Sequence, residues 1–554
     1  MSAGTEYDYV IIGAGSAGCV LANRLTESPD VSVLVLEAGP WDHDLFIHMP
    51  SAFAYPLAGT TFNWHYETEP EPHLDNRRLH CPRGRVIGGS SSINGMVYIR
   101  GHAFDYDAWA KRAGLEDWSY FHCLPYFKKS ETRLKGADAY RGNSGPLFVT
   151  TGACRNPLYR AFIEAGREAG YPVTEDMNGH QQEGLGPMDM TVYKGRRWSA
   201  AQAYLRPAQR RDTNLEVRAR ALVTRILFEG RRAVGVEFRK GGVLETVRAS
   251  REVILSGGAI NSPQTLQLSG IGNGNHLKSL GIPVVQHLPG VGENLQDHIE
   301  AYVQYECTKP ITLYSATKPL GKLKVGIEWL LTGGGLGGTN HFESGGFIRS
   351  EPGVLHPDLQ YHFLPMAVSY DGTSAATGHG YQCHIGPMRP TSRGSVTITS
   401  SDPAKYPRII FNYMQTEQDR KEMRNGIKLT REILEQPALA PYRGEELAPG
   451  PAAKSDADID AFIRAKAESA YHPSCTCRMG TDEMAVVDGD ARVHGVEGLR
   501  VVDASIMPDV VSGNLNVPTI MMAEKLADKI RGRTPLPPET VPVWVNPNWK
   551  TAQR

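Results

Sequence analysis

Residues 9–37 read YVIIGAGSAGCVLANRLTESPDVSVLVLE, and this stretch decides the fold. The apolar run at 9–12 has no polar alternation, which predicts a strand buried on both faces. A glycine-rich loop follows at 13–18, and residues 19–25 have the composition of a helix. A second apolar run at 31–36 predicts the next strand. Strand, glycine loop, helix and strand in this order are typical of a Rossmann-type βαβ unit.

The loop and the end of the second strand carry the residues that a dinucleotide requires. Gly13 permits the tight turn, Gly15 lets the backbone approach a pyrophosphate, and Gly18 lets the helix touch the strand. The helix N-terminus supplies unpaired N–H groups and a partial positive charge. Glu37 can accept hydrogen bonds from the adenosine ribose hydroxyls, which disfavours NADP. A purely structural glycine turn is the alternative, and FAD and NAD both remain open from these residues.

Composition narrows the class of protein. The chain has 554 residues, with 59 Lys+Arg against 60 Asp+Glu, so no global basic field favours nucleic acid. Eight cysteines are too sparse for a disulfide scaffold, and we expect no structural metal. Residues 1–8 lack a basic stretch and a cleavage site, and no apolar run reaches 18 residues, so we expect a cytoplasmic protein. Peripheral association with the inner membrane stays open.

Three further glycine-broken loops interrupt the chain. Residues 84–95 are too rich in small side chains for a packed element, and their amides and hydroxyls suit a second face of an extended cofactor. A plain surface loop is the alternative there. Residues 253–256 predict a buried strand that leads into a second such loop at 257–263, and a third lies at 289–298.

With these loops in view, the chain resembles the glucose-methanol-choline (GMC) family of FAD-dependent oxidoreductases from Tyr7 to about Arg533. The first family signature matches GRVIGGSSSIN at 84–94. The second matches 258–272, with Thr265 where the family usually has an aliphatic residue. The carboxyl-terminal motifs YHPSCTCRMG, LRVVDASIMP and SGNLNVPT match at residues 471–480, 499–508 and 512–519.

The resemblance implies FAD as the cofactor. Choline oxidases of this family carry a histidine tied covalently to the flavin, and this chain has Ile93 at that position, which predicts non-covalent FAD. The residues that the resemblance and the glycine loop assign to the cofactor are Gly13, Gly15, Ser16, Ala17, Gly18, Glu37, Ala38, Trp64, Arg85, Gly89, Ser90, Asn94, Gly95, Met96, Val97, Val223, Asp503, Ala504, Asn514 and Thr519.

The resemblance also implies the chemistry of an alcohol oxidation. Removing a hydroxyl proton while a hydride passes to flavin N5 needs a base near neutral pKa, which suits histidine. His472 matches the family's base. Asn514 matches the donor that holds the developing alkoxide. The alternative for Asn514 is that it caps a helix beginning near Pro518.

Within the family, the likeness is greatest to choline-oxidising members, in YETEPEP at 66–72 and DEMAVVDG at 482–489. The resemblance implies oxidation of choline to betaine aldehyde, and leaves open a second oxidation to glycine betaine. A quaternary ammonium group must be recognised by a carboxylate or by aromatic faces. The residues that match this substrate side are Glu300, His362 and Tyr471.

One departure weakens the expectation of choline. Several choline-oxidising relatives have a Trp-Trp pair where this chain has Pro319-Leu320, and Tyr305, Tyr314 and Phe342 are the candidate replacements. The alternatives are a dehydrogenase of another primary aliphatic or aromatic alcohol, and a flavoprotein that turns over no alcohol. The resemblance implies a respiratory quinone or a dye as electron acceptor more than dioxygen.

The scattered motifs predict a discontinuous domain organisation. We expect an α/β fold in which a Rossmann-like FAD-binding domain is assembled from several segments, with an α+β substrate-binding domain built on an antiparallel sheet. The glycines at 333–338 predict a loop, with a lid as the functional alternative. The expected segments are 1–160, 190–305 and 465–535 for FAD, 161–189 and 306–464 for substrate, and 536–554 as a surface tail.

Overall fold

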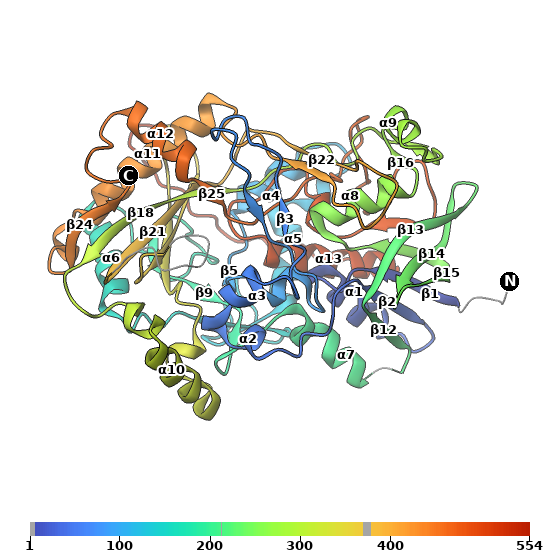
Figure 1. Cartoon of the computed structure of the whole chain (residues 1–554), viewed down its shortest axis with the longest axis horizontal. Helices are drawn as coiled ribbons and strands as arrows, with labels where there is room; N and C mark the ends of the chain where they lie inside the picture. The colour runs from blue at the N-terminus through green and yellow to red at the C-terminus, as the bar shows by residue number, and fades with distance from the viewer. Residues whose placement is uncertain (1–5, 212, 369–377) are drawn as a thin grey trace.

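The computed structural model describes residues 6–211, 213–368 and 378–554, and two large sheets organise them (Figure 1). The first is seven-stranded and mixed, in the order β12-β2-β1-β15-β14-β13, with β26 paired to β15. Its parallel strands are β12 (Leu215–Ala219), β2 (Val33–Glu37), β1 (Glu6–Ile12), the end of β15 (Val243–Leu255) and β26 (Leu499–Val501). Its antiparallel strands are β13 (Ala221–Glu229) and β14 (Arg232–Lys240).

The second sheet is antiparallel and lies on the opposite side of Figure 1. Its order is β24-β18-β21-β20-β19-β8, with β25 paired to β18. Its strands are β24 (Arg443–Ala448), β18 (Ile299–Cys307), β21 (Gly380–Pro387), β20 (Leu359–Leu364), β19 (Ser344–Ile348), β8 (Gly184–Pro187) and β25 (Glu468–Ser469). The two sheets confirm the predicted fold class. β18 runs across residue 305, where we expected a boundary between segments, because its register with β21 extends from Ala301 to Glu306.

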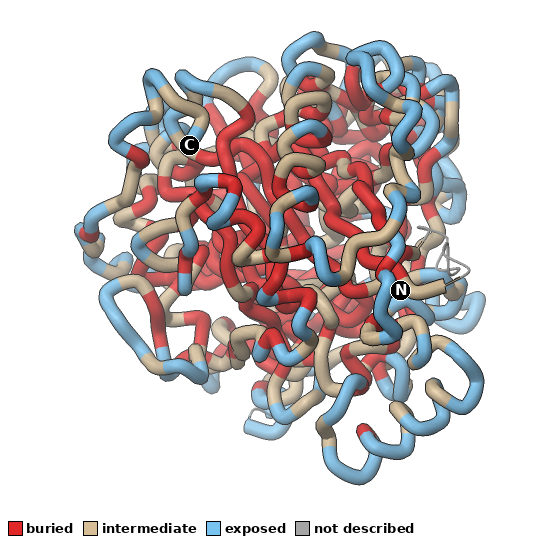
Figure 2. The backbone as a smooth tube through the Cα atoms, turned by 90° about the vertical axis from the view of Figure 1, so that its left-hand side faces the viewer, coloured by how far each residue is buried: buried red, intermediate tan, exposed pale blue. Residues whose placement is uncertain are grey.

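Helices cover the sheets and complete two separate cores. α1 (Ser16–Leu25) packs on α13 (Asn516–Ile530), and α5 (Tyr120–Ser130) packs on α13. On the second sheet, α11 (Glu417–Leu434) packs along β21 and α6 (Pro157–Glu168). Figure 2 shows the buried backbone running continuously through the middle of the molecule. Apolar side chains of α1, β1, β2 and α13 form one core, and those of β18, β20, β21 and α11 form the other.

The glycine loop folds as its sequence requires. Gly13 has a φ of +99°, and a Cβ there would lie 2.5 Å from the carbonyl oxygen of Ser256. A Cβ on Gly18 would lie 2.0 Å from the carbonyl oxygen of Gly13, so only glycine lets α1 approach this turn. The chain therefore passes from β1 into α1 within three residues, and the start of α1 is held at the carboxyl end of the sheet.

After α13 the chain crosses the molecule. The Leu536 amide donates to the hydroxyl of Tyr126 in α5, at 3.0 Å. Farther on, Asn546 donates to Glu183 just before β8, and the final residue, Arg554, forms an ion pair with Glu432 in α11. Residues 536–554 thus contact helices that cover both sheets. Among the residues that the structure describes, no helix combines the length and the apolar character needed to cross a membrane.

The glycines at 333–338 end one helix and form another. Gly333 caps α10 (Pro319–Thr332) with a φ of +65°, and Gly335–Gly338 form a short 3-10 helix. Gly337 approaches the indole of Trp329 so closely that a Cβ would lie 2.5 Å from its Cβ. This segment is therefore packed against α10, as the loop interpretation favours.

Candidate active site

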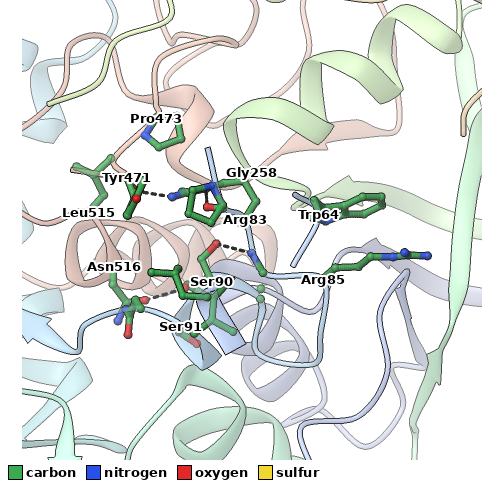
Figure 3. A pocket seen from close by; sticks show the side chains of 18 of the residues that line it. Trp64, Arg83, Arg85, Ser90, Ser91, Gly258, Tyr471, Pro473, Leu515 and Asn516 are labelled. Atoms are coloured by element: carbon green, nitrogen blue, oxygen red, sulfur yellow. Dashed lines mark hydrogen bonds between the residues drawn. The ribbon is translucent and has the colours of Figure 1, made fainter. Parts of the chain in front are cut away.

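A cavity of about 710 Å³ lies where the two sheets meet. Ile12 and Leu36 line it from the ends of β1 and β2, and Glu300, His362 and His384 line it from the second sheet. Every residue that the sequence assigned to cofactor, catalysis or substrate lines this cavity except Gly18, which faces Gly13 instead. Figure 3 shows Tyr471 and Leu515 on one side of the cavity and Trp64 and Arg85 on the other.

Two helix N-termini converge on the cavity. α1 begins at Ser16 and α13 begins at Asn516, and the Ser16 hydroxyl donates to Asn516 Oδ1 at 2.7 Å. Both helices present unpaired N–H groups and the positive ends of their dipoles to the same place. This arrangement suits a pyrophosphate. Because Leu515 is the N-cap of α13, the alternative interpretation that Asn514 caps this helix is wrong.

Glu37 sits at the dinucleotide end of the cavity. Its carboxylate accepts hydrogen bonds from the backbone N–H groups of Ala14 at 2.9 Å and Gly39 at 2.8 Å. Burial raises the pKa of Glu37 to about 7, although these two hydrogen bonds act in the opposite direction. Each carboxylate oxygen has a second lone pair, so the group can still accept hydrogen bonds from a diol.

The loop after β4 (His80–Cys81) supplies further polar atoms. The guanidinium of Arg85 lies 5.0 Å from the ring centroid of Trp64, which stacks on Tyr66. Arg85 Nε and the Ser256 hydroxyl are buried and have no hydrogen-bond partner among the described residues. A cavity lined by glycine backbone and by unsatisfied buried polar atoms fits a large polar cofactor.

Arg197, which sequence reasoning missed, fixes the loop at 89–97. It is fully buried and donates to the carbonyls of Ile47, Ser91 and Asn94 and to Asn94 Oδ1. Burial lowers the pKa of Arg197 to about 9. The same loop directs Ile93 toward the cavity, within an apolar cluster with Ile47.

Asp503 and Ala504 line the cavity from the segment after β26. The Asp503 carboxylate accepts hydrogen bonds from the Gly258 amide, the Ser262 hydroxyl and the Ser505 amide. Burial raises its pKa. Asp503 thus joins the start of α8 (Gly258–Leu268) to the segment after β26. Val223 and Thr519, also assigned to the cofactor, line the cavity as well.

The backbone of His472 is held by a buried carboxylate. The His472 amide donates to Asp297 Oδ1 at 2.6 Å, and Asp297 Oδ2 accepts from the hydroxyls of Ser469 and Tyr413. The residue before the histidine, Tyr471, has a φ of +65°, so the chain turns sharply there. Burial raises the pKa of Asp297 to about 6. These contacts fix where the imidazole enters the cavity.

The hydrogen bonds of two imidazoles determine which nitrogen of His472 is basic. His298 Nε2 lies 3.0 Å from the carbonyl oxygen of Met388, which can only accept, so this nitrogen carries hydrogen. Burial lowers the pKa of His298 to about 4, so its Nδ1 is bare and accepts from His472 Nδ1 at 3.0 Å. His472 Nε2 is then the bare nitrogen, and Asn514 Nδ2 donates to it at 3.0 Å. Burial also lowers the pKa of His472 well below its ordinary value.

Asn514 is oriented by a third polar side chain. Gln360 Nε2 donates to Asn514 Oδ1 at 3.1 Å, which leaves the amide N–H group of Asn514 directed at His472. A base and a hydrogen-bond donor therefore lie side by side on the cavity wall. This pair can take a proton from a hydroxyl and stabilise the oxygen that remains.

A second chain of hydrogen bonds ends on Glu300. The Val368 amide and Gln304 Nε2 both donate to Gln382 Oε1, at 2.8 and 2.7 Å. Gln382 therefore directs its NH₂ group to His384 Nε2, at 2.6 Å. Because that nitrogen accepts, His384 Nδ1 carries hydrogen and donates to Glu300 Oε1 at 3.2 Å. His384 thus orients the carboxylate.

Aromatic rings surround this carboxylate. Tyr302 packs against His384 with ring centroids 4.0 Å apart, and Phe342 meets both His384 and His362 edge to face. His362 Nε2 is buried without a hydrogen-bond partner among the described residues, and burial lowers its pKa to about 4.

The backbone of Tyr471 is held by an arginine. Its carbonyl accepts a hydrogen bond from Arg83 at 2.6 Å, as the dashed line in Figure 3 shows.

Not every candidate aromatic residue lies here. Phe342 lines the cavity, but Tyr305 stacks on Tyr381 and Tyr314 lies beside His379, both outside the cavity lining. Pro319-Leu320 open α10, whose first residues are exposed. Among the residues that sequence reasoning missed, Asp297 and His298 belong to a loop already singled out at 289–298. Besides Arg197, the other missed residues are Arg83, Tyr302, Gln360, Gln382 and His384.

Known proteins resemble this chain along most of its length. A family model described as GMC oxidoreductase matches residues 7–300, and its carboxyl-terminal counterpart matches 390–523. Oxygen-dependent choline dehydrogenases of Chromohalobacter salexigens and Pseudomonas syringae are 59% and 58% identical, with 98% of this chain and 98% and 97% of theirs covered.

Solved structures of other oxidases have a similar fold. Pyridoxine 4-oxidase from Mesorbium loti superposes with a TM-score of 0.87 at 34% identity, over 95% of this chain and all of that one. Formate oxidase from Aspergillus oryzae superposes with a TM-score of 0.90 at 26% identity, over 96% and 99%. The family model covers more than half of the chain, and the relatives cover almost all of it. The chain therefore belongs to the GMC oxidoreductase family.

Proposed function

We propose that this chain is an FAD-dependent choline dehydrogenase that oxidises choline to betaine aldehyde. The observation that carries the proposal is the presence of an unprotonated imidazole nitrogen and an oriented carboxylate, His472 Nε2 and Glu300, on one cavity wall. The names and the 58–59% identity of the choline dehydrogenases support the same substrate.

FAD is the cofactor expected of this family, and the cavity suits it. The N-termini of α1 and α13 would hold the pyrophosphate, and Glu37 would bind the ribose hydroxyls. Arg85 Nε and the Ser256 hydroxyl offer buried polar atoms for further contacts. We propose that the cofactor is not covalently attached at residue 93, because the isoleucine there has no nucleophilic atom.

Two side chains would handle the hydroxyl group of the substrate. His472 Nε2 takes the proton, and the Asn514 amide N–H donates to the oxygen as negative charge develops on it. His298 keeps the opposite nitrogen of His472 protonated throughout, so the proton can enter only at Nε2. When bound, FAD supplies the acceptor for the hydride at its N5 position.

The trimethylammonium group would lie against Glu300. This group has no N–H to donate, so charge and aromatic faces must recognise it. Tyr302 and Phe342 provide such faces near the carboxylate, and Tyr471 and His362 line the cavity beside them. Burying a cation and a carboxylate together is favourable only if each is compensated, which the hydrogen bond from His384 to Glu300 helps to achieve.

The remaining expectations extend this proposal. We assign the FAD-binding domain to 1–160, 190–305 and 465–535, the substrate domain to 161–189 and 306–464, and a surface tail to 536–554. We propose a respiratory quinone or a dye, more than dioxygen, as the electron acceptor, with peripheral association at the inner membrane, whereas the relatives' names point to dioxygen. Reoxidation of the reduced enzyme by a soluble quinone analogue, compared with air-saturated buffer, distinguishes the two acceptors.

Anaerobic substrate addition tests the proposed function. Choline should bleach the visible flavin absorbance of the holoenzyme, and 1-octanol and benzyl alcohol at the same concentration should not. Bleaching by either alcohol but not by choline would assign the chain to another primary alcohol. Bleaching by none of them would exclude alcohol oxidation. A second oxidation is tested by adding betaine aldehyde and looking for glycine betaine.

A further inference from the structure

The helix α10 projects from the molecule with its apolar side outward. It forms the lower edge of Figure 1, and the same edge of Figure 2 is largely exposed backbone. Of its 14 residues only Trp329 is buried, at 2% exposure, and its indole N–H donates to the Gly195 carbonyl at 2.6 Å. Trp329 thus anchors the helix, and half-buried Val325 packs with it against Met49 and Ala52.

Five large apolar residues of α10 are exposed. They follow one another at i, i+3, i+7, i+10 and i+11, which places them in one stripe about 100° wide. Trp329 lies on the opposite side of the helix. In globular proteins such a stripe normally faces the core, so its exposure calls for a partner. The members of this stripe, here called the α10 face, are Leu320 (82% exposed), Leu323 (60%), Ile327 (49%), Leu330 (60%) and Leu331 (81%).

A second pair of exposed apolar rings lies on the short helices beside α10. Phe46 of α2 (Leu45–His48) stacks on Tyr55 of α3 (Ala54–Ala58), and these rings are 45% and 49% exposed. The Lys322 ammonium of α10 lies 5.6 Å from the Tyr55 ring centroid, so this pair lies on the side of α10 that carries Lys322.

Lys324 borders the α10 face, whereas Lys318 and Lys322 lie toward the opposite side of the helix. Lys318, Lys322 and Lys324 are all exposed, against a single glutamate, Glu328, so the helix and its N-cap carry a net charge of +2. An exposed apolar stripe with a lysine at its edge and further lysines on the polar side is typical of helices that lie in the headgroup region of an anionic membrane. In a symmetric contact between two copies, the Lys324 side chain at the edge of the face would approach its own copy, which opposes dimerisation through this face.

We propose that the α10 face docks the protein onto an anionic lipid surface, with the helix lying in the plane of the interface. Some residues that line the cavity lie close to the same region in the chain. Ser51, Phe53 and Leu57, which line it, flank or belong to the α2–α3 segment, and Leu313 lies just before α10. Docking at a lipid surface would also bring the cavity close to a lipophilic electron acceptor such as a quinone. That consequence rests on the proposed function, but the docking itself does not.

Sedimentation with vesicles tests the docking independently of turnover. Holoenzyme should bind phosphatidylglycerol-containing vesicles, and Leu323→Gln/Leu331→Gln should bind about tenfold more weakly or worse. The matched control is Val243→Gln/Leu244→Gln on the β15 hairpin, whose side chains are 61% and 54% exposed and which should bind as the wild type does. All three proteins should reduce a soluble dye equally with choline, so failure of docking and failure of the proposed function are distinguishable.

Charge reversal tests the lysines. Lys322→Glu and Lys324→Glu should each weaken binding about fivefold, and vesicles of phosphatidylcholine alone should bind poorly. Equal binding by the wild type and the Leu323→Gln/Leu331→Gln variant would overturn the proposal. So would a wild type that ignores anionic vesicles, or one that is a dimer in solution and becomes monomeric in the variant. The last outcome would assign the α10 face to a second copy of the chain.

Discussion

The imidazoles of His298 and His472 meet through their Nδ1 atoms, 3.0 Å apart, with ring planes at 79°. Since the Met388 carbonyl fixes the hydrogen of His298 on Nε2, this contact sets the tautomer of its neighbour. His298 thus acts as a positioning residue. The Met388 carbonyl, which is two hydrogen bonds from His472, thus determines which nitrogen of His472 is basic.

Replacing the base should abolish most of the chemistry. His472→Ala should slow flavin reduction by choline about 100- to 10,000-fold, the range typical of a lost general base. Stopped-flow absorbance measures this rate. The ratio of visible to ultraviolet absorbance should stay at the wild-type value, because cofactor retention depends on the opposite end of the cavity. A rate within tenfold of wild type would exclude His472 as the base.

Activity should persist below the ordinary histidine pKa. The active form of His472 is neutral, so activity is lost as pH falls through its pKa. Burial lowers that pKa, which moves the acid limb of kcat/KM to below about pH 6.5. A pH profile with choline checks this. An acid limb above pH 7 would contradict the neutral, buried imidazole described here.

Removing the charge of Glu300 should affect choline selectively. Glu300→Gln should lower kcat/KM for choline about 100-fold, because a buried cation would lose its counter-charge. The uncharged analogue 3,3-dimethyl-1-butanol has the same shape and should be affected far less. The ratio of the two kcat/KM values is the measurement. An unchanged ratio would show that Glu300 does not contact the cation.

His384 should act through Glu300. His384→Gln lacks a donor at the Nδ1 position and should raise the KM for choline about five- to tenfold with little change in kcat. His384→Asn keeps a donor near that position and should retain a lower KM. A purely structural role would instead lower kcat and thermal stability in both variants alike.

Glu37 should make apoprotein stability depend on pH. Its pKa is raised to about 7 in the fold, so deprotonation opposes folding as pH rises from about 4.5 to 7. The free energy of unfolding of Glu37→Gln minus that of wild type should therefore grow by about 3 kcal/mol between pH 4.5 and 8. Denaturant titration of both apoproteins measures the difference. Glu67→Gln, at an exposed glutamate outside the cavity lining, should show no such trend.

The sequence predicted the βαβ unit well because local chemistry determines it. The apolar runs specify buried strands, and Gly13 and Gly18 specify the tight turn between the first strand and the helix. The structure contains these elements. His384 and Arg197 could not be found in this way. Each acts through partners distant in sequence, Glu300 and Asn94, and neither lies in a motif with its own spacing. The alternative role of Asn514 as a cap failed because Leu515 is the N-cap of α13 and the Asn514 amide is bonded to His472 and Gln360.

The carboxyl-terminal segment has a practical consequence for anyone shortening the chain. Arg554 pairs with Glu432 of α11, whereas Glu539 pairs with Lys128 of α5. Removing residues 537–554 would therefore release helices that cover both sheets, although none of these residues lines the cavity.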